Sequence, residues 1–264
     1  MHGSDYEVLA PFYNALLRNR NHFEAQANML QRLCSRLNIG KMARLLDAAC
    51  GTGESLVLLH KNGWLNISGL DGSKAMLAEA HRLETLTGVS LNACSWENLD
   101  EYFSTHDTYD LVFFLGHALP HAPLELVRKV LGYVFDGLNP GGYLLFDMRK
   151  WSRAPDGGLF QEGRPAGVSR QLGMFTVDEK DYLIDECCTY ISGRQQIEYR
   201  IRKARKDGTG EDGAGEDKEK KPCLFYTPFT VQEAMDWLSE TGFQNIEWEQ
   251  PSDWPYMILF GQKK

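Results

Sequence analysis

The stretch that decides the fold is Leu45-Leu46-Asp47-Ala48-Ala49-Cys50-Gly51-Thr52-Gly53-Glu54. An apolar run ends in an acid, small residues and two glycines follow, and a segment able to form a helix comes next. This order predicts a strand, a tight turn and a helix. Because Gly51 and Gly53 lack a Cβ, the backbone can turn sharply and a ligand can approach it closely. The N–H groups at the start of the helix favour an electron-rich ligand group.

A second apolar run, Leu65–Leu70, ends in Asp71. In doubly wound α/β folds, an acid at the tip of the second strand binds ribose hydroxyls, so the two stretches together predict a nucleotide-like ligand. The dinucleotide pattern G-x-G-x-x-G fails because Leu56 stands at the third glycine position. A dehydrogenase is therefore a disfavoured alternative.

The run Asp47-x-x-Cys50-Gly51-x-Gly53 resembles the first motif of the class I S-adenosylmethionine-dependent methyltransferases, and Asp71 resembles the ribose-binding acid of that family. The resemblance implies S-adenosylmethionine as cofactor and S-adenosylhomocysteine as its product. It also implies a set of residues that contact the cofactor. These are Asp47, Ala49, Gly51, Gly53, Asp71, Gly72, Met76, Ser95, Trp96, Leu115 and Gly116.

The composition narrows the possible partners and the compartment. The chain has 264 residues, of which 43% are hydrophobic, enough for one large α/β domain or two small ones. A formal net charge of −8 argues against nucleic acid and against anionic membranes as partners. The N-terminus has no signal-peptide form, and the six cysteines include no C-x-x-C pair, so we expect a cytoplasmic protein with reduced thiols. The sequence shows no metal-ligand cluster, and we expect no metal.

Strands alternate with helices as far as residue 146, which predicts a doubly wound, Rossmann-like, mainly parallel sheet. Residues 169–205 instead show β-rich runs typical of antiparallel strands. We therefore expect two parts. Residues 1–150 and 228–264 would form the cofactor-binding core with an N-terminal helical lid, and residues 151–227 an inserted antiparallel β cap over the substrate site, with a mobile loop at 203–221.

Periodicity and stop signals give approximate bounds for the elements. A turn is expected at residues 139–142. Helices are predicted over residues 5–17, 22–37, 54–62, 73–87, 123–138 and 230–241. Strands are predicted over residues 45–47, 65–70, 89–94, 109–115, 143–146, 174–177, 182–191, 195–201, 224–226, 246–248 and 257–260.

Aromatic residues stand near the expected ligand site. Trp96 follows the third strand, at the carboxyl edge where ligands bind, and its indole could cover an adenine ring or a cationic sulfonium. The alternative is a tryptophan that closes the core edge. Tyr6 and Tyr13 on the first helix are candidates to touch ligand, with core packing as the alternative.

Over nearly its full length the chain resembles glycine N-methyltransferase and its glycine/sarcosine relatives. The loop Leu115–His121 looks like the family's L-G-N-S-F-A-H, and Asp147–Trp151 looks like its D-H-R-N-Y stretch. The pair Ser95-Trp96 is similar to the family's Asn-Trp pair, and Pro255–Phe260 is similar to its terminal strand.

The resemblance assigns roles in the acceptor site. Arg149 matches the arginine that holds the substrate carboxylate, a role that suits the guanidinium fork. His121 matches the family histidine, whereas His117 replaces an asparagine that touches the substrate, which argues against glycine itself. The predicted substrate-binding residues are Arg149, His117, Tyr13 and Tyr226, and the predicted catalytic residues are His117 and His121.

Three functions remain open at this point. The first is N-methylation of a small amine or amino acid, in which the acceptor is a carboxylated amine. The second is O- or C-methylation of a specialised metabolite, with His117 as the base. The third belongs to another class, a non-catalytic module that binds S-adenosylmethionine. The oligomeric state is also open at this point, and the resemblance raises a homo-oligomer because the family often assembles through its N-terminal region.

Overall fold

A computed structural model describes residues 3–18, 22–83, 86, 88–154, 157–161, 163–204 and 219–264. Most of the loop predicted at 203–221 lies outside the described residues, as does the predicted last residue of the helix over residues 73–87. Among the helices of the described residues, none is both long and apolar enough to cross a membrane.

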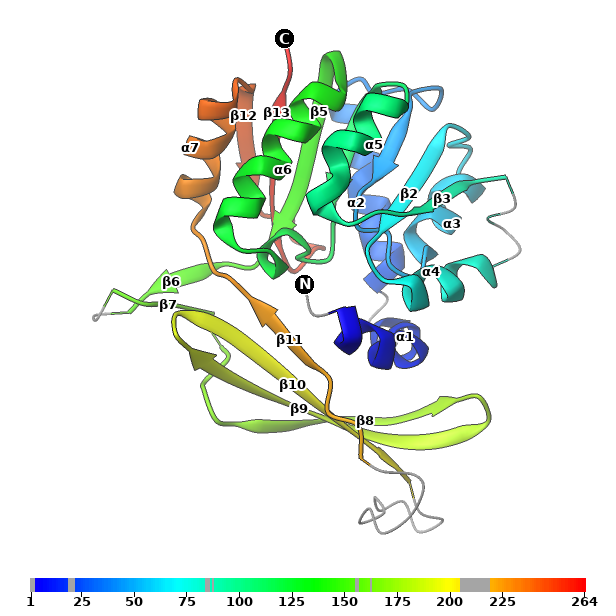
Figure 1. Ribbon diagram of the computed structural model, residues 1–264, viewed down its shortest axis with the longest axis vertical. Helices are drawn as coiled ribbons and strands as arrows, with labels where there is room; N and C mark the ends of the chain where they lie inside the picture. Colours follow the sequence, from blue (N-terminus) through cyan, green and yellow to red (C-terminus); the bar gives the residue numbers. More distant parts are fainter. Residues whose placement is uncertain are drawn as a thin grey trace.

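A sheet of 7 strands forms the centre of the molecule, in the order β12-β13-β5-β4-β1-β2-β3 (Figure 1). The strands from β3 to β5 run parallel, and β13 and β12 run antiparallel at one edge. This arrangement confirms the predicted doubly wound, mainly parallel sheet. The strands are β1 (Leu45–Asp47), β2 (Ile67–Asp71), β3 (Ser90–Ala93), β4 (Tyr109–Phe114), β5 (Leu138–Met148), β12 (Gln244–Glu249) and β13 (Met257–Gln262).

Each strand sends alternate side chains to opposite faces of the sheet, as the pleat requires. Leu46 packs into one apolar cluster and its neighbour Leu45 into the other. Helices therefore cover both faces, as the near-continuous apolar strands predict. One face carries α2 (His22–Arg36), α3 (Glu54–Lys61) and α4 (Lys74–His81), and the other α5 (Leu99–Thr105), α6 (Leu124–Gly137) and α7 (Val231–Thr241).

A packing exchange explains why Leu56 is tolerated where dinucleotide-binding folds place a glycine. That glycine normally lets the helix lie close to the strand. Here the space comes from Gly69 on β2, where a Cβ would lie 2.7 Å from Leu56 Cδ1 and 2.9 Å from Cys50 Sγ. The helix therefore still begins close to the sheet, next to the glycine turn.

A four-stranded antiparallel sheet, in the order β11-β10-β9-β8, lies beside the carboxyl edge of the central sheet (Figure 1). Helix α1 (Gly3–Arg18) lies between the two, and Phe12 on α1 packs against Tyr182 of the antiparallel sheet with ring centroids 5.0 Å apart. The antiparallel strands are β8 (Ser169–Val177), β9 (Lys180–Ile191), β10 (Arg194–Lys203) and β11 (Cys223–Tyr226), and β6 (Trp151–Arg153) pairs with β7 (Leu159–Gln161).

The structure corrects three expectations about the elements. Helix α4 ends at His81, several residues before the predicted end. The turn predicted at 139–142 lies inside β5, where the pairing with β4 is irregular. Helix α5 was not predicted, because a helix of 7 residues is too short to establish a periodic pattern.

Candidate active site

Two loops meet at the carboxyl edge, where β1 and β4 lie side by side and the chain leaves them toward opposite faces of the sheet. Ligands bind at such a switch point in doubly wound folds. One loop turns at Gly51 and Gly53, with φ of 54° and 74°, and the other at Gly116, with φ of 77°. His117 follows with a φ of 62°, a left-handed conformation that is unusual for a residue with a side chain.

The first loop opens into a cavity of about 240 Å³ between β1, α4 and helix α1. Asp47 and Gly53 of the predicted cofactor set do not line it. Burial raises the pKa of Asp47 to about 8, although a hydrogen bond from the Ala49 N–H opposes the rise. The predicted residues that do line this cavity are Ala49, Gly51, Asp71, Gly72, Met76, Ser95, Trp96, Leu115 and Gly116.

Asp71 is held in place by two backbone N–H groups. Its Oδ2 accepts from Gly51 at 2.8 Å, and its Oδ1 accepts from Ser73 at 2.8 Å. Each carboxylate oxygen has a second lone pair to offer, so both oxygens can also accept from a vicinal diol. Burial raises the pKa of this carboxyl, and the two N–H bonds oppose the rise. A Cβ at Gly51 would meet nothing closer than Tyr13 Cε1 at 3.9 Å, so the backbone there is open to the cavity.

Trp96 stands at the boundary between the first cavity and the core. Its indole lines the cavity, yet it is only 4% exposed. Its Nε1 donates to the Ala48 carbonyl at 2.8 Å, and its ring packs edge-on against Phe114. These contacts fix the indole as a rigid apolar wall of the cavity.

A second cavity, of about 920 Å³, extends from the first toward the antiparallel sheet. Tyr6, Tyr13, Gly116 and His121 line both cavities, which marks their junction. Arg149 and Tyr226 of the predicted substrate set line the second cavity, whereas His117 lines neither of the two. The structure therefore brings Tyr13, Arg149 and Tyr226 of this predicted set to one cavity and leaves His117 outside its lining.

His121 is committed to structural hydrogen bonds on both ring nitrogens. Its Nδ1 lies 3.0 Å from the Phe225 carbonyl, which only accepts, so Nδ1 carries the proton. Its Nε2 then accepts from the Tyr6 hydroxyl at 2.8 Å. Burial and the charge of Arg149 lower the pKa of His121 to about 3. The hydrogen bond between Tyr6 and His121 connects helix α1 to the loop after β4.

His117 is fully buried and has a similarly fixed protonation state. Its Nδ1 accepts from the Arg149 N–H at 3.0 Å, so the proton of the neutral ring sits on Nε2. Burial, followed by the charge of Arg149, lowers the pKa of His117 well below its usual value. The ring stacks on Tyr226, with centroids 5.1 Å apart. His117 therefore braces the strand end that carries Arg149.

Sequence reasoning gave Asp147 no role in the site beyond its place in a motif. Its carboxylate accepts from the Gly116 N–H at 3.1 Å, from the His117 N–H at 2.6 Å and from Trp254 Nε1 at 3.0 Å. Burial raises the pKa of Asp147 to about 7, against these bonds. The only signal in the sequence was an acid at the end of an apolar strand, beside Arg149.

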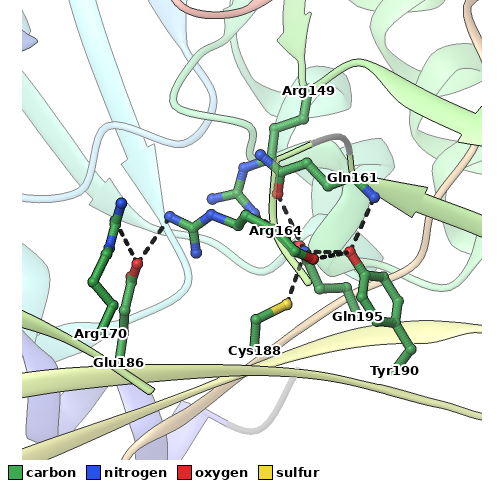
Figure 2. A network of polar contacts seen from close by, with 8 residues as sticks. All are labelled: Arg149, Gln161, Arg164, Arg170, Glu186, Cys188, Tyr190 and Gln195. Atoms are coloured by element: carbon green, nitrogen blue, oxygen red, sulfur yellow. Dashed lines mark hydrogen bonds and ion pairs between the residues drawn. The ribbon is translucent and has the colours of Figure 1, made fainter. Parts of the chain in front are cut away.

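Arg149 is anchored by neutral groups (Figure 2). Its Nη1 donates to Gln195 Oε1 at 3.0 Å, and its guanidinium lies 4.5 Å from the centre of the Tyr226 ring. The Nε2 of Gln195 in turn lies 3.2 Å from Gln161 Oε1, from Cys188 Sγ and from the Tyr190 hydroxyl, which share its two N–H donors. Gln195 is fully buried, and the alternation of β10 gave no sign of this role.

The chemistry of this site fits a nucleoside-like cofactor with a polar tail. An oriented carboxylate, an open glycine backbone and an apolar wall share the first cavity. Among the described residues, no group of His, Cys, Asp and Glu side chains has the arrangement needed to hold a metal ion.

Comparison with known proteins supports the same conclusion. Residues 45–142 match the family described as Methyltransferase domain. A putative methyltransferase from Geobacillus sp. is 25% identical over 98% of this chain and 99% of its own length. Glycine N-methyltransferase from Mus musculus is 24% identical over 65% of this chain and 59% of its own length.

Among solved structures, the fold is similar to an S-adenosylmethionine-bound amino pentose methyltransferase from Micromonospora echinaspora, which is involved in calicheamicin biosynthesis. The TM-score is 0.73, with 22% identity and 96% of each chain covered. At this identity the likeness concerns the fold alone. The domain match over residues 45–142, the full-length relative and the shared fold together support an S-adenosylmethionine-dependent methyltransferase.

Proposed function

We propose that this enzyme methylates the amine nitrogen of a small-molecule acceptor that carries an acidic group. The acceptor would occupy the 920 Å³ cavity, with its amine at the junction near Gly116 and its acidic group toward Arg149. The observation that carries the proposal is the fixed protonation state of His121, which lines the junction, and of His117, which follows Gly116 in the loop after β4.

On this proposal, Asp71 would hold the ribose hydroxyls of the cofactor, and Trp96 and Met76 would flank its adenine. When bound, S-adenosylmethionine supplies a methyl group already activated by a sulfonium. The protein then has to align the acceptor and exclude water. Helix α1 would help to align the acceptor and to exclude water, because its residues Tyr6 and Tyr13 lie at the junction of the two cavities.

The histidines favour an amine over a hydroxyl as nucleophile. A hydroxyl acceptor benefits from a base, and a base of pKa about 3 is too weak to help near neutral pH. His117 lines neither cavity, and its one acceptor nitrogen already receives the Arg149 N–H. A neutral amine needs no base before attack: its lone pair forms the C–N bond, the S–C electron pair returns to sulfur, and the product loses a proton to solvent.

The names of the relatives support nitrogen as the acceptor atom, because glycine and an amino pentose both present an amine. The cavity favours the larger of the two. A volume of about 920 Å³ lies near the upper end of the range for drug-sized ligands, far beyond what glycine needs.

The test is a screen by product mass. The protein is incubated with S-adenosylmethionine and with matched acceptors, namely acidic amino sugars, amino acids, and the corresponding alcohols without an amine. We expect a gain of one methyl group only on the amines, with kcat/KM rising with pH as the acceptor amine loses its proton. Methylation of the alcohols with equal efficiency would contradict the proposal.

The low pKa of His121 predicts a pH-dependent stability. Its folded pKa of about 3 lies below the value of about 6.5 expected in the unfolded chain, so between these values only the unfolded state binds the proton. As the pH falls from about 6 to 4, wild type should lose up to about 1.4 kcal/mol of stability per pH unit relative to His121→Gln. Urea unfolding of both proteins at each pH measures this difference, and a constant difference would contradict it.

A further inference from the structure

The wall of the acceptor cavity on the side of the antiparallel sheet carries more positive charge than Arg149 alone supplies. Arg164 and Arg170 line the same cavity, and the buried Glu186 lies between them (Figure 2). Arg170 Nη2 contacts Glu186 Oε1 at 2.5 Å, and Arg164 Nη2 contacts the same oxygen at 3.1 Å. One carboxylate oxygen is therefore shared by two guanidinium groups.

The charges of this wall do not balance. Arg149, Arg164 and Arg170 carry three positive charges against the single negative charge of Glu186, which leaves an excess of two. Lys150 and Asp253, which also line the cavity, contribute one charge of each sign. Among the described residues that line the cavity, the excess of two remains, in a chain whose net charge is −8.

The arginines also keep donors for a ligand. A guanidinium has five N–H groups, and the contact with Glu186 accounts for one amino group of each arginine. Arg164 and Arg149 both act electrostatically on Tyr226. Burial raises the pKa of Tyr226, and the charges of the two guanidinium groups oppose that rise. Figure 2 shows the Arg164 side chain reaching between Glu186 and Arg149.

We propose that Arg164 and Arg170, together with Arg149, form an anion subsite, and that the acceptor carries a doubly charged oxyanion group such as a phosphate ester or a pair of carboxylates. The Arg164 side chain is only 20% exposed, so its charge is poorly screened by water, whereas Arg170 is 57% exposed and stands at the solvent side of the wall. Guanidinium forks match the oxygens of both kinds of group. The inference rests on the proposed function, since it takes this cavity as the acceptor site.

The experiment measures anion binding to the full chain saturated with S-adenosylhomocysteine. Calorimetry is run with inorganic pyrophosphate, phosphate, succinate and acetate as probes. We expect the doubly charged probes to bind at least tenfold more tightly than acetate. Tighter binding of pyrophosphate or phosphate than of succinate would identify a phosphate-type acceptor. Tighter binding of succinate would identify a dicarboxylate. Equal binding of acetate, or no binding of any probe, would overturn the proposal.

Two variants move the affinity in opposite directions. Arg164→Gln/Arg170→Gln should weaken binding of the doubly charged probe at least tenfold, whereas Glu186→Gln removes the competing carboxylate and should tighten it. A purely structural ion pair would lower the melting temperature in both variants and leave the affinity unchanged, which would overturn the subsite. Arg128→Gln is the matched control, because Arg128 pairs with Glu240 on the exposed surface.

The result is separable from the proposed function. If the probes bind as expected and no amine is methylated, the subsite stands and N-methylation fails. If amines without any oxyanion group are methylated as efficiently as charged ones and the probes do not bind, the proposed function stands and the subsite fails.

Discussion

Replacing Asp71 with alanine is expected to weaken binding of S-adenosylhomocysteine by at least about 100-fold. A hydrogen bond to a charged group contributes about 1.5–3 kcal/mol, and the carboxylate can accept from both ribose hydroxyls. The variant also releases the N–H groups of Gly51 and Ser73, which Asp71 holds at 2.8 Å, so the glycine turn loses its brace. Calorimetry of the purified variant measures the loss.

Two controls separate ligand contact from folding. Asp71→Asn keeps one carbonyl acceptor, so its affinity for S-adenosylhomocysteine should fall about tenfold, to a value between those of wild type and the alanine variant. Asp107→Ala removes an acid that is 82% exposed and pairs with Arg44, and it should bind the ligand like wild type. If Asp71→Ala melts like wild type and keeps its affinity, the ribose is held by another group and the cofactor assignment at β2 is wrong.

The cofactor side of the site could be predicted from sequence because its residues follow strands directly. An apolar run that ends in an acid and is followed by glycines predicts both the turn and its position at the carboxyl edge of the sheet. Asp71 ends β2 and Trp96 stands just beyond β3, so a local pattern was enough to place them together. The parallel pairing of the strands follows from the same alternation of strands and helices, whereas their order in the sheet is seen only in the structure.

The acceptor side could not be predicted in the same way. Gln195, Arg164 and Glu186 lie in or beside antiparallel strands, where an inward polar residue looks the same as one facing solvent. Their partners lie far along the chain, as the hydrogen bond between Arg149 and Gln195 shows. Which side chains meet over such a separation depends on the register of the strands, which the sequence does not reveal. His117 was placed in the acceptor site by resemblance, but it lines neither cavity, and its ring stacks on Tyr226 while its Nδ1 accepts from the Arg149 N–H.

Replacing Arg149 with alanine is expected to lower kcat/KM for the acidic acceptor by about 100- to 1,000-fold, mainly through KM. A charge-assisted, two-point contact with an oxyanion contributes several kcal/mol when it is shielded from water. Arg149 lines the acceptor cavity and is absent from the walls of the cofactor cavity, so S-adenosylhomocysteine should bind within about twofold of wild type. Arg149→Lys should recover part of the loss, because an ammonium keeps the charge and loses the fork.

Gln195→Glu tests whether the charge of Arg149 is kept available for the acceptor. The amide oxygen of Gln195 holds Nη1 at 3.0 Å without neutralising the guanidinium, whereas a carboxylate of the same shape would pair with it. We therefore expect Gln195→Glu to raise KM at least tenfold while the cofactor affinity stays unchanged. Gln195→Met, which removes the anchor without adding a charge, should raise KM less. Equal effects of Gln195→Glu and Gln195→Met would mean that Gln195 only packs the wall of the cavity. Unchanged kinetics of Arg149→Ala would show that Arg149 does not bind the acceptor.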